Sequence, residues 1–333
     1  MGYKKIWQPS TIPLQNDLSA WKGVFNDLHA NLISAGLVQT ATAGQLVIND
    51  VASLPARDTY AGFIEYSLND ALQAEAPVVL KLEFGCGEEG LDYNVSTSRR
   101  ITAAPRIRST VFFKGSPSNT FGCPQIYSTT IDGESYQNTL YGTSYICNNA
   151  ARGFFGVVYG AGSRGSWGGS PPNPAYRAAT FSVFLQRSLS AEGAPTGDGL
   201  AIYLNGLDVA AGVSVTGGTW TGANLPAAYS QYLPGHSNSI SRGYAVRINA
   251  PASVKSANGE LLFEPIYYSA PALKQFPYIY SYNYEALADG SQLALDVGPG
   301  QLLNFIALGR ETSMSIDGYD AQRAGLIMLF DED

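Results

Sequence analysis

The sequence predicts a mainly β protein: an antiparallel β-sandwich or jelly-roll-like body with one amphipathic helix near the N-terminus. Three observations predict it. Charged residues make up only 14% of the chain, against about 25% in a typical globular protein. Gly (36), Pro (18) and Tyr (21) are abundant instead, which is the composition of short strands joined by many turns. Finally, one segment repeats its apolar residues at helical spacing, whereas most of the remainder alternates with period two.

Residues 1–15 are typical of an extended arm, with Trp7, Pro9 and Pro13 among them. Such an arm packs either across a neighbouring subunit or on its own chain, and the sequence leaves both open. No apolar run of the secretory-signal kind follows Lys4 and Lys5. Nowhere do 18 apolar residues stand together, so we expect no membrane insertion.

A helix is predicted over residues 16–36, at the start of a β-rich body that extends over residues 16–333. Asn16 or Asp17 can cap its first turn, and Gly36 tolerates the positive φ of a helix end. The helix must bury its apolar stripe on its own sheet or on a neighbouring chain. The stripe consists of Leu18, Trp21, Phe25, Leu28 and Leu32.

Period-two alternation and turn residues predict the strands. They are expected at residues 44–50, 62–68, 76–85, 109–115, 125–131, 139–146, 152–160, 179–188, 199–206, 244–250, 259–269, 278–284, 302–309 and 325–331. Loops are predicted at residues 160–174, 190–199 and 216–241. The first of these suggests a weak subdivision of the body near residues 160–175.

Five aromatic residues are the predicted partner-binding residues. Tyr and Trp are enriched in interfaces, and on small polar loops they supply contact area at little cost in conformational entropy. Trp167 lies in the first predicted loop, and Trp220 and Tyr232 lie in the third. Trp7 of the arm and Trp21 of the helix complete the set.

No catalytic or cofactor-binding pattern is convincing, so the sequence predicts a protein that is not an enzyme and needs no cofactor. The glycine-rich stretch at residues 160–165 resembles a dinucleotide-binding motif. The helix that such a motif requires cannot form, because SWGGSPPNP follows. The two histidines, His29 and His236, lie near no G-x-S-x-G elbow.

Metal and nucleic-acid sites are not expected either. The three cysteines, Cys86, Cys123 and Cys147, lack metal-ligand spacing. Calcium at Asp317 and Asp320 is a lesser alternative to a solvated turn, and calcium at Asp331, Glu332 and Asp333 is a lesser alternative to a frayed tail. The net charge of −7 disfavours nucleic acid, which usually needs a basic patch. The densest basic cluster is interpreted as a solvated or inter-subunit face; it consists of Arg99, Arg100, Arg106 and Arg108.

Two stretches resemble a family of tailed-bacteriophage virion structural proteins. The first runs from the end of the predicted helix to residue 85, and its matching residues are Ala35, Gly36, Gln39, Thr40, Gly44, Gln45, Asn69, Asp70, Pro77, Lys81 and Gly85. The second spans residues 181–200, and its matching residues are Phe184, Arg187, Ser188, Gly193, Thr196 and Gly199. Leu37, Ala43 and Gln186 depart from the pattern, where the family usually has an aromatic residue, Thr or Asp, and Glu.

The resemblance implies a structural component of the neck or collar, the tail or the baseplate. Such a protein is assembled in the host bacterial cytoplasm and is localised to the virion, in multiple copies. Its partners would be copies of itself and other virion proteins. On that hypothesis, deletion of residues 1–15 leaves a folded monomer that fails to join the particle.

Two alternatives stay open. The first is a receptor- or glycan-binding protein of a tail tip or fibre, or a capsid-decorating protein, with its site on the aromatic loops. The second is an enzyme that cleaves surface polysaccharide, which would need a carboxylate pair that sequence patterns do not reveal.

Overall fold

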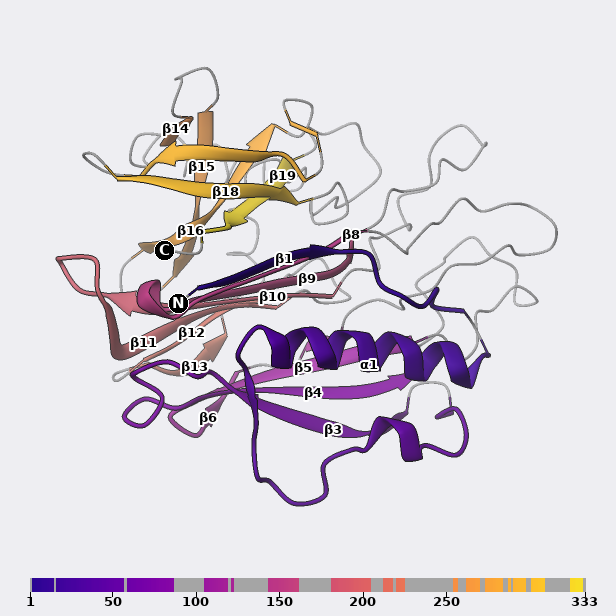
Figure 1. Cartoon of the computed structure of the whole chain (residues 1–333). Coiled ribbons are helices and arrows are strands. Elements are labelled where there is room, and N and C mark those ends of the chain that lie inside the picture. The colour runs from indigo at the N-terminus through magenta and orange to yellow at the C-terminus, as the bar shows by residue number, and fades with distance from the viewer. Residues whose placement is uncertain are drawn as a thin grey trace.

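The structure is a computed structural model that describes part of the chain. The described residues are 2–14, 16–56, 59–86, 105–118, 121–122, 143–161, 181–204, 212–217, 220–224, 254–256, 262–269, 273–283, 287–288, 290–297, 301–308 and 324–331. Within them the protein is mainly β, with three antiparallel sheets and an α-helix near the N-terminus (Figure 1). The predicted fold class is therefore confirmed. The strands predicted at 125–131 and 244–250 lie outside the described residues.

The central layer is a seven-stranded antiparallel sheet. Its strands, in spatial order, are β1 (Tyr3–Trp7), β8 (Thr143–Asn149), β9 (Phe154–Ala161), β10 (Phe181–Leu189), β11 (Pro195–Leu204), β12 (Gly212–Gly217) and β13 (Trp220–Asn224). The edge strand β1 comes from the segment predicted as an arm. It pairs with β8 from Tyr3, opposite Asn148, to Trp7, opposite Ser144. Residues 3–7 thus add a strand to the chain's own sheet.

The second sheet is built from residues 38–122. Its strands are β2 (Val38–Gln39), β3 (Tyr60–Ser67), β4 (Val78–Cys86), β5 (Pro105–Phe113) and β6 (Ser116–Pro117), and β7 (Phe121–Gly122) also pairs with β5. Along β4 the side chains of Val78, Leu80 and Leu82 are buried, while Val79 and Lys81 between them are half-buried. This alternation is the period-two pattern of a sheet with one covered face.

The C-terminal strands close into a barrel. In spatial order they are β14 (Val254–Ser256), β15 (Leu262–Ser269), β16 (Leu273–Asn283), β19 (Ala324–Leu329), β18 (Leu302–Leu308) and β17 (Gln292–Asp296). The end of the barrel returns to the start of the chain, since the Lys4 ammonium lies 5.6 Å from the centre of the Phe330 ring. The two termini lie near each other in Figure 1.

The helix α1 (Leu18–Ser34) packs against both open sheets (Figure 1). Asp17 caps it, because its Oδ1 accepts a hydrogen bond from the Ala20 N–H at 2.9 Å. Trp21 Nε1 donates to the Gly85 carbonyl at 2.9 Å, and the Tyr159 hydroxyl donates to the Val24 carbonyl at 3.1 Å. The apolar stripe is therefore buried on the chain's own sheets.

Apolar clusters cover both faces of the central sheet. Val157 and Val183 point into the cluster that contains α1 and β3–β5. Val158 and Phe184, one residue further along, point into the cluster that contains the barrel. Alternate side chains of a strand face opposite ways, so strands β9 and β10 are buried on both faces. Their sheet joins the two halves of the molecule.

One predicted strand is wrong, and several short strands were missed. Residues 44–50 form a loop followed by a 3₁₀ turn, η1 (Ile48–Asp50). Strand β13 and the end of β12 fall in the loop predicted at 216–241, and β11 begins inside the turn predicted at 190–199. The missed short strands also include β1, β2, β14 and β17.

Candidate functional site

Two of the predicted partner-binding aromatics lie in the chain's own core. Trp21 has no exposed surface, and Trp7 is 8% exposed. Trp7 Nε1 donates to Asp27 Oδ2 at 2.9 Å, and its ring lies 6.1 Å from that of Tyr159. Neither indole has a free face to offer a partner. Their prediction as contact residues is therefore corrected to a core role.

The other three aromatics are not tested by the structure. Trp220 begins β13, but its side chain lies outside what is described. Trp167 and Tyr232 lie outside the described residues. Their role in partner binding stays a prediction.

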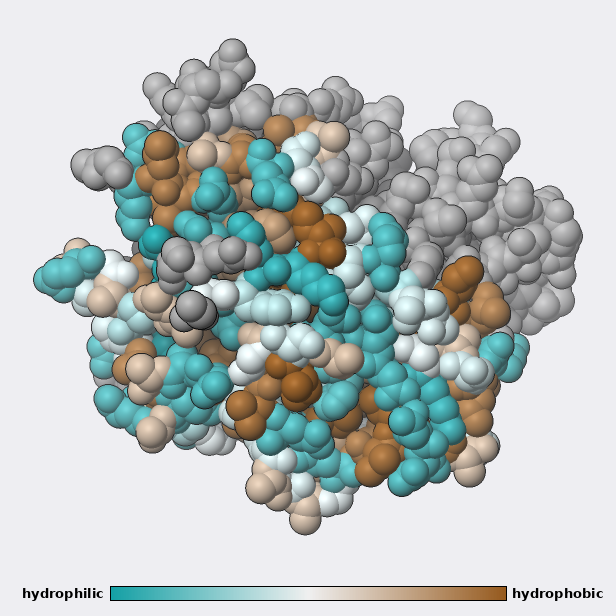
Figure 2. All heavy atoms as spheres, in the orientation of Figure 1, coloured by the Kyte–Doolittle hydropathy of each residue, from teal (hydrophilic) through white to brown (hydrophobic). Residues whose placement is uncertain are grey.

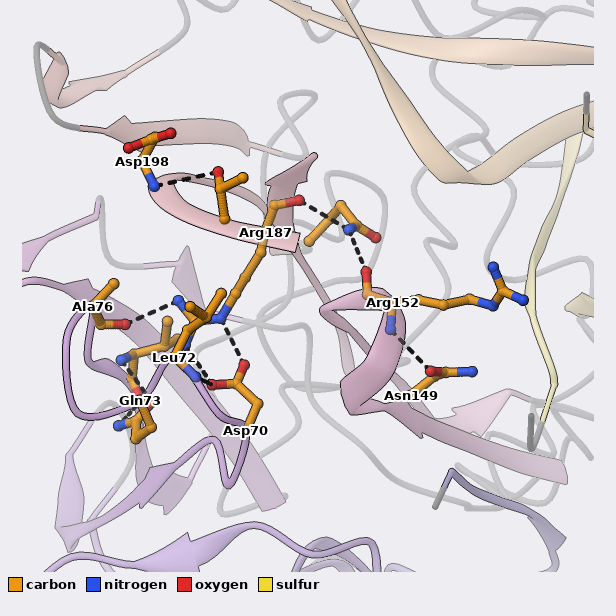
Figure 3. Close-up of polar contacts among 11 residues, drawn as sticks. Asp70, Leu72, Gln73, Ala76, Asn149, Arg152, Arg187 and Asp198 are labelled. Atoms are coloured by element: carbon orange, nitrogen blue, oxygen red, sulfur yellow. Dashed lines mark hydrogen bonds and ion pairs between the residues drawn. The ribbon is translucent and has the colours of Figure 1, made fainter. Parts of the chain in front are cut away.

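The strongest polar feature of the described residues is a buried ion pair between Asp70 and Arg187. Arg187 Nε donates to Asp70 Oδ2 at 2.6 Å, and Nη2 donates to Asp70 Oδ1 at 2.8 Å. Arg187 Nη1 donates to the Ala76 carbonyl at 2.9 Å. The side chains are 0% and 8% exposed. Figure 3 shows the Arg187 side chain reaching from its strand to both acceptors.

Local hydrogen bonds hold each partner of this pair in place. Asp70 lies in the turn after β3, where its Oδ1 also accepts from the Leu72 N–H at 3.1 Å. In the same turn the Gln73 amide bonds both the N–H and the carbonyl of Val78. The hydrogen bond from the Leu72 N–H thus helps to orient the Asp70 carboxylate for its two hydrogen bonds with Arg187.

Close backbone approaches hold the arginine strand. The Arg187 N–H donates to the Gly153 carbonyl at 2.9 Å. Gly153 has φ 60°, and a Cβ there would lie 2.9 Å from the Arg187 Cβ and 2.7 Å from the Pro195 Cβ. Only glycine meets both requirements without strain.

The neighbouring Gln186 is buried as well. Its Nε2 donates to the Arg152 carbonyl at 3.0 Å and to the Arg187 carbonyl at 2.9 Å. Two carbonyl acceptors require a donor, which an amide supplies and a carboxylate does not. The amide of Gln186 therefore satisfies both carbonyls, as a glutamate carboxylate at this position could not.

The ion pair joins the two stretches on which the family resemblance rests. Asp70 belongs to the first stretch and Arg187 to the second, 117 residues apart. Gly197 of the second stretch also lies against Ala76, where an added Cβ would approach the Ala76 Cβ to 3.1 Å. The sequence named Asp70 and Arg187 only as members of separate motifs. No spacing signal could have paired them.

A second polar cluster organises the edge of the six-stranded sheet. In a regular antiparallel pair the Glu65 N–H would donate to the Thr40 carbonyl. Here the Gln45 amide is inserted between them: its Oε1 accepts from the Glu65 N–H at 2.9 Å, and its Nε2 donates to the Thr40 carbonyl at 2.6 Å. On either side the main-chain ladder continues, from Thr40 N–H to the Glu65 carbonyl and from Leu46 N–H to the Phe63 carbonyl.

That insertion makes residues 41–44 project as a loop. Gly44 has φ 78°, and the Thr42 hydroxyl donates to Glu65 Oε2 at 2.6 Å. Thr40, Gly44 and Gln45 all belong to the resembled motif. We call residues 38–47 the edge segment.

The outer face of β3–β5 carries charged and aromatic side chains. Arg108 donates two hydrogen bonds to Glu83, at 2.6 and 2.7 Å, and its guanidinium lies 4.3 Å from the Tyr60 ring centre. The hydrogen bond to Glu83 is the main cause that raises the pKa of Arg108. The pair is partly exposed, at 39% and 18%. Arg108 is thus engaged within the chain, while Arg99 and Arg100 lie outside the described residues.

His29 and the two described cysteines are half-buried or buried within the fold. His29 Nδ1 lies 2.8 Å from the Tyr66 hydroxyl, and burial lowers the His29 pKa. Burial raises the pKa of the Cys86 thiol to about 11. Cys147 is buried as well, and its Sγ lies 3.8 Å from the Asp331 carbonyl oxygen. Within the described ranges no three His, Cys, Asp or Glu residues gather as metal ligands would. No described helix has the length and apolarity needed to cross a membrane.

Comparisons with known proteins add no relative. No family model, no curated protein and no solved structure matches this chain.

Proposed function

We propose that this protein is a non-enzymatic structural component of a tailed-bacteriophage particle, present in multiple copies in the neck or collar, the tail or the baseplate. The observation that carries the proposal is the Asp70–Arg187 ion pair. It brings the two family-like stretches together in space, so their resemblance concerns one connected structural unit.

The chemistry of the pair supports a structural role. Both charged groups are shielded from solvent and are bonded to each other and to the main chain. Burying such a pair costs desolvation, and apolar residues of similar volume often stabilise a protein as well or better. What the pair adds is a fixed geometry between the β3–β4 turn and strand β10. A fixed geometry is what a repeated building block of an assembly requires.

The proposal is tested on purified phage particles from cultures that produce the protein. Immunogold labelling and quantitative mass spectrometry are expected to find several copies per particle at one location. Particles that are complete and infectious without the protein would refute the role.

A matched pair of variants tests the link between fold and incorporation. Asp70→Ala should reduce incorporation strongly, because it leaves the buried guanidinium unpaired. Glu83→Ala, which breaks the partly exposed pair with Arg108, should leave incorporation near wild type. Equal incorporation of both variants would contradict the importance assigned to the buried pair.

A further inference from the structure

The N-terminal arm, residues 2–13, lies on a surface that the rest of the chain forms. Its strand β1 pairs with β8 from Tyr3 to Trp7. The Trp7 side chain packs into the apolar cluster that contains α1, and Pro9 and Pro13 are buried as well. Figure 1 shows β1 running above α1, to which a short connector joins it. We call the surface that holds the arm, formed by β8 and α1, the arm seat.

The arm seat is fitted to the side chains of this particular arm. Lys5 Nζ donates a hydrogen bond to Asn31 Oδ1 of α1 at 2.7 Å. A Cβ added at Gly23 of α1 would overlap the Thr11 side chain, so the helix has a glycine where the arm crosses it. Because these contacts are specific to the sequence of the arm, the segment of another protein chain that fits the seat best is the same arm of a second copy.

The connector between the arm and α1 is less favourable than the arm itself. Asn16 has φ 52°, in the left-handed region that residues with a side chain seldom adopt, although Asn enters it more readily than most. Ile12 and Leu14 are 50% and 43% exposed. Figure 2 shows hydrophobic surface at the right of the view, where Figure 1 places the chain between β1 and α1. A connector that extends toward a second copy would not need the turn at Asn16.

Exchange of arms between copies preserves the contacts in the seat. The pairing of β1 with β8 and the burial of Trp7 are the same whether the arm belongs to the same chain or to another. The net charge of −7 is also divided unevenly. Residues 1–15 contain Lys4 and Lys5 and no Asp or Glu, which leaves 18 basic against 27 acidic residues in the remainder. The arm is thus the part of a neighbouring copy that the acidic remainder of a chain attracts.

We propose that the arm is exchangeable, so that in the assembled particle residues 2–13 of each copy occupy the arm seat of a neighbouring copy; the inference rests on the multi-copy role proposed above. At low concentration the isolated chain keeps its own arm, as in the structure. Assembly brings copies to a high local concentration, which favours the exchanged form. Each copy then supplies a strand to the sheet of the next, and Trp7 of one copy completes the core of another.

A disulfide between arm and seat records which chain supplied the arm. Lys4 lies opposite Cys147 in the β1–β8 pair. Opposite residues of an antiparallel pair have Cα atoms about 4.5–5.5 Å apart, within the range of a disulfide. The test variant is Lys4→Cys, with Cys86 and Cys123 replaced by Ala, and it is oxidised and analysed on a non-reducing gel. Arms in their own seats give monomers with an internal disulfide, whereas exchanged arms give covalently linked dimers or longer chains.

The expected result differs between the free chain and the particle. The dilute purified variant should give internally linked monomers, and the variant incorporated into particles should give linked dimers or longer chains. The matched control adds Cys147→Ala to the same variant. It should form neither product, because the thiol introduced at Lys4 then has no opposite partner.

Two substitutions at Asn16 shift the balance in opposite directions. Asn16→Gly accepts a positive φ without strain and should favour the monomer that holds its own arm. Asn16→Pro fixes φ near about −65°, which the closed connector cannot use, so the dimer fraction should rise about tenfold or more. Sedimentation velocity after refolding at high concentration measures the dimer fraction, and circular dichroism confirms that the variants are folded. If Asn16→Pro does not fold, the disulfide assay decides alone.

Three outcomes separate this inference from the proposed function. If the protein is present in particles in multiple copies and every trapped arm is internally linked, arm exchange is overturned and the proposed function stands. An equal dimer fraction for folded Asn16→Gly and Asn16→Pro would also overturn it. Absence from particles would remove the proposed function, whereas linked dimers of the purified, concentrated chain would still support exchange between copies.

Discussion

At the scale of single residues, burial determines how much unfolding free energy is lost when an ion pair is broken. Asp70–Arg187 is shielded from solvent, whereas Glu83–Arg108 has the same two-bond geometry on a partly exposed face. We predict that Asp70→Ala lowers the free energy of unfolding by about 3–5 kcal/mol, because the guanidinium is left buried and unpaired. Glu83→Ala should cost about 1 kcal/mol or less. Urea unfolding of the two variants measures the difference, and similar losses would contradict this account.

Gln186 offers a second residue-scale prediction. Gln186→Glu replaces the amide by a carboxylate of the same length, at a site that is 1% exposed. The carboxylate would face the Arg152 and Arg187 carbonyls, to which Nε2 now donates. We expect a loss of about 2 kcal/mol or more in unfolding free energy at neutral pH. Gln186→Met, which removes the donor without adding a charge, should cost less. The reverse order would contradict the assigned orientation of the amide.

His29 should make stability depend on pH. Burial lowers its pKa in the folded protein below the ordinary value of 6.5, so the unfolded chain binds the proton more readily. The contribution of His29 to the free energy of unfolding is therefore at its maximum above about pH 7, and it decreases as the pH falls through 6.5. His29→Gln should flatten the unfolding free energy between pH 7 and about pH 5, relative to wild type. An unchanged pH profile would show that His29 is solvated in the folded protein.

At the scale of elements, β1 is part of the folded body. The Trp7 side chain packs into the apolar cluster that contains α1, while the side chain of its neighbour Ile6 is 42% exposed. Trp7→Ala should cost about 3–5 kcal/mol, and Ile6→Ala less than about 1 kcal/mol. Thermal unfolding of both variants checks this. Deletion of residues 1–15 is correspondingly expected to destabilise the monomer, in place of the folded truncated chain that an extended arm would allow.

Elements with strong periodicity could be predicted from the sequence. The stripe of α1 and the alternation of β4 each reflect a burial pattern that the local sequence already contains. Strand β1 has no such signal, because its partner β8 begins at residue 143. Residues 44–50 look like a strand, but the side chain of Gln45, and not its main chain, bonds the Glu65 N–H of β3. Side-chain insertions and partners far apart in the sequence are set by tertiary structure, which a local pattern does not encode.

At the scale of the whole molecule, the net charge and the multi-copy role proposed above make a joint prediction about salt. Copies with a net charge of −7 repel each other, and added salt screens that repulsion as the Debye length falls from about 30 Å at 0.01 M to about 8 Å at 0.15 M. If copies meet through uncharged surfaces, self-association should strengthen over this range. Contacts built from ion pairs would weaken instead. Sedimentation equilibrium at the two salt concentrations separates these outcomes. Weaker association at 0.15 M would contradict a contact through uncharged surfaces and would indicate a charged face, such as the outer face of β3–β5.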